Sequence, residues 1–255
     1  MVERGLASTR EKARALILAG EIFSDGSPVR KAGELLAAGA PLELRPRRPR
    51  FVGRGGEKLE GALPALGVDA RGALVWDIGA STGGFTDCLL RRGAARVVAV
   101  DVGRAQIDAG LRADPRVTLR EGINARYLRP GDLPGPPDLV VVDVSFISLD
   151  KVLPPLAAAA PAADIVSLVK PQFEVGRGRV GRGGIVRDAD LQEQTLLRLC
   201  ARALDWGLKV TGVAESPVRG ARGNREFFVR WSPLASAAPV ADVARAVREA
   251  VHGQG

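Results

Sequence analysis

Histidine and cysteine are almost absent from this sequence, and their scarcity argues against several kinds of active site. The 255 residues include one histidine, His252, and two cysteines, Cys88 and Cys200. The cysteines lie far apart in apolar segments, so neither a metal-ligand spacing nor a disulfide framework is present, as is typical of a reducing compartment. Catalysis by a Ser-His-Asp triad or a Cys-His pair is therefore disfavoured, and we expect no metal site.

Long apolar runs are missing as well. The sequence contains no stretch of about 18 apolar residues, roughly the minimum for a helix that spans a membrane. The opening stretch, MVERGLASTREKARALILAG, carries charges throughout and does not resemble a secretory signal. We therefore expect a cytoplasmic protein that does not enter the membrane.

Positive charge, in contrast, is plentiful. Lys and Arg number 37 against 29 Asp and Glu, which gives a formal net charge of +8 and an isoelectric point near 10.3. This balance suggests a polyanionic partner, either nucleic acid or an anionic membrane surface. Hydrophobic residues make up 46% of the chain, enough for the core of one α/β domain and a smaller module.

Residues 1–45 are predicted to form a small α+β module. The segment ASTREKARALILAGE has apolar residues at helical spacing and is followed by short strand-like pieces with a turn at SDGS. The basic residues of this module either bind RNA or form a solvated helix face, and residue types alone do not separate the two interpretations. The candidates for RNA binding are Arg4, Arg10, Lys12 and Arg14.

Residues 46–56 are predicted to be a basic linker. Proline and arginine alternate in RPRRPRFVGRGG, residues 45–56, without an apolar pattern. Because proline-rich segments are extended and semi-rigid, we expect this one to present positive charge, including that of Arg54, to the RNA.

Helical and strand-like segments alternate from residue 57 to residue 232. Continuous β-branched runs between helices are typical of a parallel sheet that is covered on both faces, so we predict a Rossmann-like α/β domain. The last two predicted strands close the sheet, and residues 233–255 form an extension with a probable helix and no assigned function. The predicted strands are ALVWDIGA, ARVVAVDVG, DLVVVDVSF, ADIVSLVKPQF, LKVTGVAESPV and NREFFVRW.

A glycine-rich loop, in VWDIGASTGGF at residues 75–85, follows the first of these strands. Ligands of open parallel sheets bind beyond the carboxyl ends of the strands, and glycines let the backbone approach them closely. The next strand ends in an acid, Asp101, placed to bind the two hydroxyls of a ribose. Because the loop lacks the G-x-G-x-x-G spacing, the pattern resembles class I S-adenosylmethionine-dependent methyltransferases more than a nicotinamide or nucleotide site, the alternative on this architecture. The expected cofactor-binding residues are Asp77, Gly79, Ala80, Ser81, Thr82, Gly83, Gly84, Phe85, Asp101, Val102, Asn124 and Asp143.

Lysine is used sparingly, and two of the lysines stand beside acids at predicted strand ends. Only six of the 37 cationic residues are lysines, and a lysine, unlike an arginine, can lose its proton when buried or crowded by positive charge. Such an amine can accept the proton of a ribose 2′-hydroxyl during methyl transfer. Structural salt bridges are the alternative for each residue alone. The four residues are Lys58, Asp143, Lys170 and Glu226.

Five segments together resemble the TlyA-type proteins, which join an S4-like RNA-binding domain to an FtsJ-like 2′-O-methyltransferase domain. The resemblance implies that Lys58, Asp143, Lys170 and Glu226 form a catalytic Lys-Asp-Lys-Glu tetrad, with Lys170 as the base. It also implies ribosomal RNA or ribosomal subunits as the partner and cytidine riboses in one or both subunits as the targets. The segments are GRGGEKLEGAL, DIGASTGGFTDCLL, DLVVVDVSFISL, LVKPQFEVG and GNREFF.

Two features depart from the family pattern: the start of the chain, and the extension after about residue 232, which lies outside the resemblance. The family's RNA-binding module begins with a strand and helix before VERGLAS, whereas this chain starts inside that segment, so the module is expected to be truncated or preceded by residues upstream.

Some family members are labelled haemolysins, and a membrane-active protein is one alternative function. An RNA-binding protein with an inactive methyltransferase fold is the other, although the intact glycine loop and tetrad positions argue against it.

Overall fold

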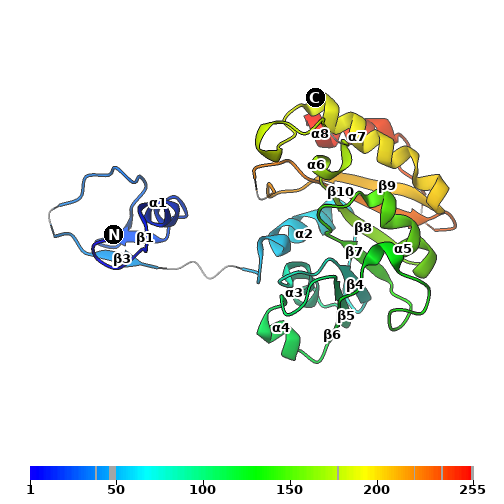
Figure 1. The fold of residues 1–255 in the computed structure, drawn as a ribbon, viewed down its shortest axis with the longest axis horizontal. Helices are drawn as coiled ribbons and strands as arrows, with labels where there is room; N and C mark the ends of the chain where they lie inside the picture. Colours follow the sequence, from blue (N-terminus) through cyan, green and yellow to red (C-terminus); the bar gives the residue numbers. More distant parts are fainter. Residues whose placement is uncertain (38, 46–49, 177, 221, 237, 254–255) are drawn as a thin grey trace. The chain divides into compact units, whose positions relative to one another are not determined.

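The computed structural model describes residues 1–37, 39–45, 50–176, 178–220, 222–236 and 238–253. It divides the chain into two compact units, Met1–Pro49 and Arg50–Gly255 (Figure 1). Each unit has a hydrophobic core of its own. Residues 46–49 of the predicted linker lie outside the described ranges.

The N-terminal unit consists of one helix and a small antiparallel sheet. Its sheet has the order β2-β1-β3, and β1 turns into β2 at Asp25 and Gly26, which both have positive φ as an Asp-Gly hairpin turn requires. The helix begins where the Thr9 hydroxyl accepts a hydrogen bond from the Lys12 backbone N–H (3.1 Å). The elements are α1 Arg10–Leu18, β1 Ile22–Ser24, β2 Ser27–Pro28 and β3 Leu42–Leu44.

The second unit is built on a seven-stranded sheet with the order β6-β5-β4-β7-β8-β10-β9. Strands β6, β5, β4, β7 and β8 are parallel, and β10 runs antiparallel to both β8 and β9. This sheet confirms the predicted Rossmann-like α/β fold. The strands are β4 Leu74–Ile78, β5 Arg96–Asp101, β6 Val117–Glu121, β7 Leu139–Val142, β8 Asp164–Val169, β9 Leu208–Glu215 and β10 Phe227–Pro233.

Helices cover both faces of this sheet (Figure 1). Neighbouring side chains on a strand point to opposite faces, so the continuous apolar runs of these strands make both faces apolar. On β4, Val75 packs in one core cluster with residues of α2, α3 and α4, whereas Trp76 and Ile78 pack in the other with residues of α5, α7 and α8. The helices are α2 Arg54–Ala65, α3 Gly84–Arg91, α4 Ala109–Ala113, α5 Leu153–Ala159, α6 Pro171–Glu174, α7 Ala189–Ala201 and α8 Val243–His252. Short 3₁₀ helices lie at Ala125–Tyr127, Leu149–Lys151, Arg182–Gly184 and Ala203–Trp206.

Helix α2 begins earlier than the sequence predicts. Residues 54–56, assigned to the extended linker, are its first turn. Phe51 explains the difference, since its ring is buried against α2 and α3, and the Val52 N–H donates to the Asp87 carboxylate (2.9 Å). One aromatic residue in a Pro-Arg stretch thus anchors the chain to the second unit and lets the helix start at Arg54.

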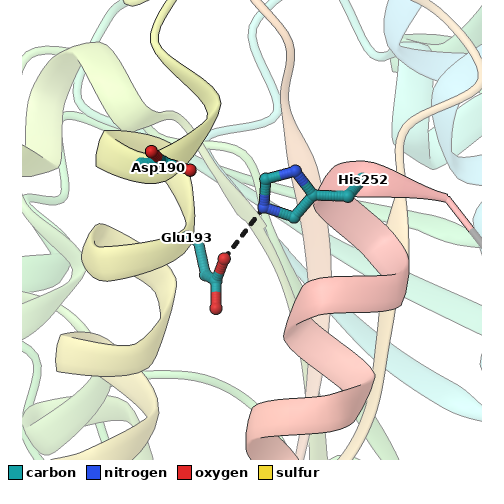
Figure 2. Close-up of side chains that lie close together, drawn as sticks. All are labelled: Asp190, Glu193 and His252. Carbon is teal, nitrogen blue, oxygen red and sulfur yellow. Dashed lines mark hydrogen bonds and ion pairs between the residues drawn. The ribbon is translucent and has the colours of Figure 1, made fainter.

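The C-terminal helix α8 packs onto the second unit. Val247 and Val251 are buried in its core, and α8 lies beside α7 (Figure 1). At the end of α8 the imidazole of His252 is 2.8 Å from a carboxylate oxygen of Glu193 on α7, and the Asp190 carboxylate lies nearby (Figure 2). Sequence spacing did not predict this cluster. His252 and Asp190 are exposed, so we interpret it as a surface contact that helps to attach α8.

Both cysteines are buried. Burial raises the pKa of each thiol to about 12, so Cys88 and Cys200 are uncharged packing residues at neutral pH. Among the helices of the described ranges, none combines the length and apolar character needed to cross a bilayer.

Candidate active site

The glycine loop after β4 is shaped by close backbone contacts. Gly79 has φ of 86°, and a Cβ there would lie 2.5 Å from the carbonyl oxygen of Asp143, directly after β7. Gly83 has φ of 98° and packs against Leu111 of α4 and Ile107. A side chain at either position would meet both a steric clash and an unfavourable backbone conformation. The loop is therefore built of small residues because the end of β7 and α4 pack closely against it. Its backbone is held in place by hydrogen bonds from the N–H groups of Gly79 and Ala80 to the Val100 carbonyl (2.8 and 3.1 Å).

Asp77, on β4, lies beneath this loop and does not line any described pocket. Its carboxyl is fully buried and accepts a hydrogen bond of 2.6 Å from the Thr86 hydroxyl. Its expected part in cofactor binding is therefore indirect, through the loop that it supports. Burial raises the pKa of Asp77 from 3.8 to about 7, the hydrogen bond from Thr86 opposes this shift, and Asp143 and Asp101 add to it.

We expect Asp77 to make stability fall as the pH rises from about 4 to about 7. The unfolded carboxyl ionises near pH 3.8, whereas the folded one keeps its proton until about pH 7, so the folded state binds more protons in this window. Within it, the free energy of unfolding should decrease by up to about 1.4 kcal/mol per pH unit. Urea unfolding of the wild type and Asp77→Asn at pH 5 and pH 8 measures the effect. The variant should lose this component of the pH dependence, and equal pH dependence of the two proteins would contradict it.

A pocket of about 600 Å³, here called the large pocket, lies beyond the carboxyl ends of β4, β5 and β7. Asp101 ends β5 at its wall, where its carboxylate accepts hydrogen bonds from the N–H groups of Ser81 (2.8 Å) and Gly103 (2.7 Å). Apolar side chains form much of the remaining wall. Of the expected cofactor-binding residues, those that line this pocket are Gly79, Ser81, Asp101, Val102, Asn124 and Asp143.

The rest of the loop faces a different hollow. A pocket of about 130 Å³ is lined by Ala80, Thr82, Gly84 and Phe85 of the loop, by Gly79, Ser81 and Asp143, and by the start of α2. Gly83 lines neither pocket because it packs against α4. Ile123, Val144 and Ile147 line the large pocket without having been singled out in the sequence. They are apolar residues in connecting loops, and no local pattern separates them from core residues.

Lys170 and Asp143 meet beside the large pocket. Nζ of Lys170, at the end of β8, is 2.6 Å from Oδ1 of Asp143, directly after β7. Because β7 and β8 are neighbouring parallel strands, their carboxyl ends bring these side chains together. Nζ also donates a hydrogen bond of 2.7 Å to the hydroxyl of Ser145, a contact that the sequence did not predict.

Lys58 and Glu226 form a second, more deeply buried pair. Nζ of Lys58 on α2 is 2.6 Å from Oε2 of Glu226, just before β10, and the two side chains are 10% and 3% exposed. Both residues, with Lys170 and Ser145, line a pocket of about 420 Å³, here called the lysine pocket. The four residues of the expected tetrad thus occur as two ion pairs, one of which also borders the large pocket.

The large pocket and the lysine pocket share two residues, Ser145 and Phe146. The Phe146 side chain is 90% exposed, its backbone has φ of 64°, and its ring lies 5.0 Å from that of Phe173. Positive φ is unfavourable for a bulky residue, so the surrounding loop holds this turn in place. A ligand in one pocket would therefore be a neighbour of a ligand in the other.

The expected RNA-binding residues belong to both units. Arg4, Arg10, Lys12 and Arg14 are exposed on the N-terminal unit, where the Arg4 guanidinium donates to the carbonyl of Ala40 (2.6 Å). Arg54 is exposed on the second unit and donates to the carbonyl of Arg219. These side chains are accessible to an anionic partner.

Comparisons with known proteins agree with this division of the chain. Residues 51–232 match the FtsJ-like methyltransferase family, and residues 1–41 match the S4 domain. The chain is 46% identical over 254 residues to the 16S/23S rRNA (cytidine-2′-O)-methyltransferase TlyA of Mycobacterium tuberculosis, covering 99% of this chain and 94% of the relative. It is 39% identical over 229 residues to Hemolysin A of Brachyspira hyodysenteriae, covering 89% and 95%.

The solved structure of a protein named as a hemolysin, from Streptococcus thermophilus, is similar over most of both chains. It has a TM-score of 0.79 and 42% sequence identity and covers 98% of this chain and 91% of that one. The family matches, the identity to curated relatives and the sheet order agree on one assignment. This chain belongs to the TlyA family of FtsJ-like methyltransferases that carry an S4 domain.

Proposed function

We propose that this protein transfers a methyl group from S-adenosylmethionine to the 2′-hydroxyl of a ribose, that of a cytidine, in ribosomal RNA. The contact between Lys170 and Asp143 carries the proposal, because Asp143 lines the large pocket and Lys170 lines the lysine pocket. A donor bound in the first pocket and an acceptor bound in the second would meet beside one lysine-carboxylate pair. Transfer between two substrates requires such adjacent sites.

The residues of the large pocket fit S-adenosylmethionine. Asp101 offers carboxylate oxygens at the end of β5 to a ribose, the loop at Gly79 and Ser81 offers backbone to the amino-acid end, and Asn124 with Val102 borders the space for an adenine. When bound, S-adenosylmethionine supplies an electrophilic methyl group, whose bond to sulfur breaks as the ribose oxygen bonds to its carbon. Asp77 supports the loop from below through Thr86.

Lys170 is the proposed general base. A ribose hydroxyl is a poor nucleophile until its proton leaves, and the neutral amine form of Lys170 accepts this proton at Nζ, which becomes the ammonium that pairs with Asp143. Asp143 and Ser145 hold Nζ in place at 2.6 and 2.7 Å. The buried Lys58–Glu226 pair forms another side of the same pocket, where it orients the hydroxyl.

Ribosomal RNA is the proposed substrate because of the S4 domain, the exposed basic residues and the named activity of the curated relative. Incubating the protein with labelled S-adenosylmethionine and separated, unmodified ribosomal subunits tests the proposal. Label should enter RNA as 2′-O-methylcytidine, detected after nuclease digestion by mass spectrometry.

Two other outcomes would overturn the proposal. RNA binding without methyl transfer to RNA from either subunit would favour an RNA-binding protein with an inactive fold. Lysis of red cells by the purified protein, in the absence of methyl transfer, would favour the membrane-active alternative.

A further inference from the structure

A pocket of about 480 Å³, here called the arginine pocket, adjoins the lysine pocket on the second unit. Four arginines line it, and no acidic residue does within the described ranges. Arg222 lines both the arginine pocket and the lysine pocket, so a ligand in the first would extend from the point where the second ends. The four arginines are Arg187, Arg219, Arg222 and Arg225.

Most of the positive charge in this pocket is uncompensated. Arg225 forms two hydrogen bonds of 2.7 Å with the Glu215 carboxylate, which balances its charge. In the part of the chain that the structure describes, Arg187, Arg219 and Arg222 pair with no carboxylate, and all three are exposed. Like charges gathered around one hollow repel each other, and an anion placed between them relieves the repulsion.

The walls of the pocket are fixed by buried amide side chains. Asn224 is 3% exposed, accepts a hydrogen bond from the Val186 N–H (3.0 Å) and donates one to the Gly184 carbonyl (2.9 Å). Gln192 is 1% exposed and donates to the Val186 carbonyl (2.7 Å). The backbone beside Arg187 is thus tied to α7 and to the turn before β10. The backbone that carries Arg187 is therefore held in place, which lowers the entropy cost of ordering this part of the pocket on binding.

We propose that the arginine pocket binds a backbone phosphate of the RNA, next to the ribose that enters the lysine pocket. A 2′-hydroxyl in a polynucleotide always has phosphates on both sides of its nucleotide, and the planar guanidinium group matches phosphate oxygens through paired hydrogen bonds. Such a contact fixes the register of the strand without reading its sequence. The inference rests on the proposed function, because it takes the acceptor ribose to lie in the lysine pocket.

Salt-dependent RNA binding by the full chain tests the proposal. Deproteinised bacterial ribosomal RNA is titrated into the wild type, Arg187→Gln, Arg219→Gln and the double variant at several potassium chloride concentrations. Each single change should weaken binding by roughly three- to tenfold and lower the salt slope by about one. Arg96→Gln is the matched control, because Arg96 is an exposed arginine at the opposite, amino-terminal end of β5, and it should change neither quantity.

Two further measurements make the outcome decisive. Affinity for S-adenosylmethionine and the thermal midpoint should stay unchanged in the double variant, which separates lost phosphate contacts from misfolding. Potassium phosphate, compared with chloride at equal ionic strength, tests a site for free phosphate. If neither substitution changes the affinity for RNA or its salt slope, the RNA proposal is overturned. Phosphate binding at the arginines would then identify a site for free phosphate. A wild type that methylates no RNA would overturn the proposed function instead, and the binding result would still decide on the pocket.

Discussion

Replacing Lys170 with methionine should lower methyl transfer to RNA by about 10²- to 10⁴-fold, the range that a positioned general base contributes. Nζ of Lys170 has two anchoring partners, Asp143 at 2.6 Å and Ser145 at 2.7 Å, and the side chain lines the lysine pocket. Methionine has a similar length but no group that can accept a proton. Initial rates with labelled S-adenosylmethionine and saturating RNA, together with calorimetric titration of S-adenosylmethionine, measure the two consequences: the rate should collapse and the affinity for S-adenosylmethionine should change little.

The variant Lys170→Arg tests whether position 170 supplies a base or only a positive charge. An arginine can pair with Asp143, yet its guanidinium stays protonated in proteins, so this variant should be as inactive as Lys170→Met. Lys151→Met is the matched control, because Lys151 is exposed and lies outside both pockets, and it should keep full activity. An arginine variant with more than about a tenth of the wild-type rate would show that charge, and not proton transfer, is what position 170 supplies.

The fold of the second unit was predictable because the signals for it are local. Continuous apolar, β-branched runs between helices, such as LVVV on β7, are typical of strands covered on both faces. Their alternation with helices predicts a parallel sheet, which holds for β6, β5, β4, β7 and β8, whereas β10 runs antiparallel to β8 and β9. Helix lengths were less predictable. AQIDAGLRAD suggested a full helix, yet α4 spans only Ala109–Ala113, because the Asp108 carboxylate caps it by accepting the Gly110 N–H (2.8 Å).

The site was predictable only in part, because its contacts join residues that are distant in sequence. Asp101 and the glycine loop follow from strand ends and spacing, and both border the large pocket. The scarcity of lysine and the predicted strand ends singled out the four residues, and the family resemblance supplied their role as a tetrad. The pairing of Lys58 with Glu226 was not predictable, because the two residues are 168 positions apart and nothing local marks them as a pair. Neither Ser145 nor the arginine pocket could be predicted from a local pattern. Ser145 lies in a loop and the arginines are scattered along the sequence, and the fold brings them next to the site only where β7, β8 and the turn before β10 lie side by side.

Removing one member of the Lys58–Glu226 pair should lower the free energy of unfolding strongly. Lys58→Met leaves the Glu226 carboxylate, 3% exposed, without its only ion-pair partner in the described residues. Removing one member of a buried pair costs about 3–5 kcal/mol in the free energy of unfolding, because an uncompensated charge stays buried. Glu226→Leu should cost a similar amount by stranding Lys58. Urea unfolding measures both, and the exposed Arg245–Glu249 pair on α8 is the control, where single changes should cost less than about 1 kcal/mol.

The double variant Lys58→Met/Glu226→Leu distinguishes a structural pair from a functional one. Two apolar side chains of similar volume remove both buried charges, and such replacements are often neutral or stabilising, so most of the lost stability should return. Methyl transfer should not return, because the lysine pocket then lacks the polar groups that orient the acceptor hydroxyl. If stability and methyl transfer recovered together, the pair would serve the fold alone, and orientation of the ribose would rest on Asp143, Lys170 and Ser145.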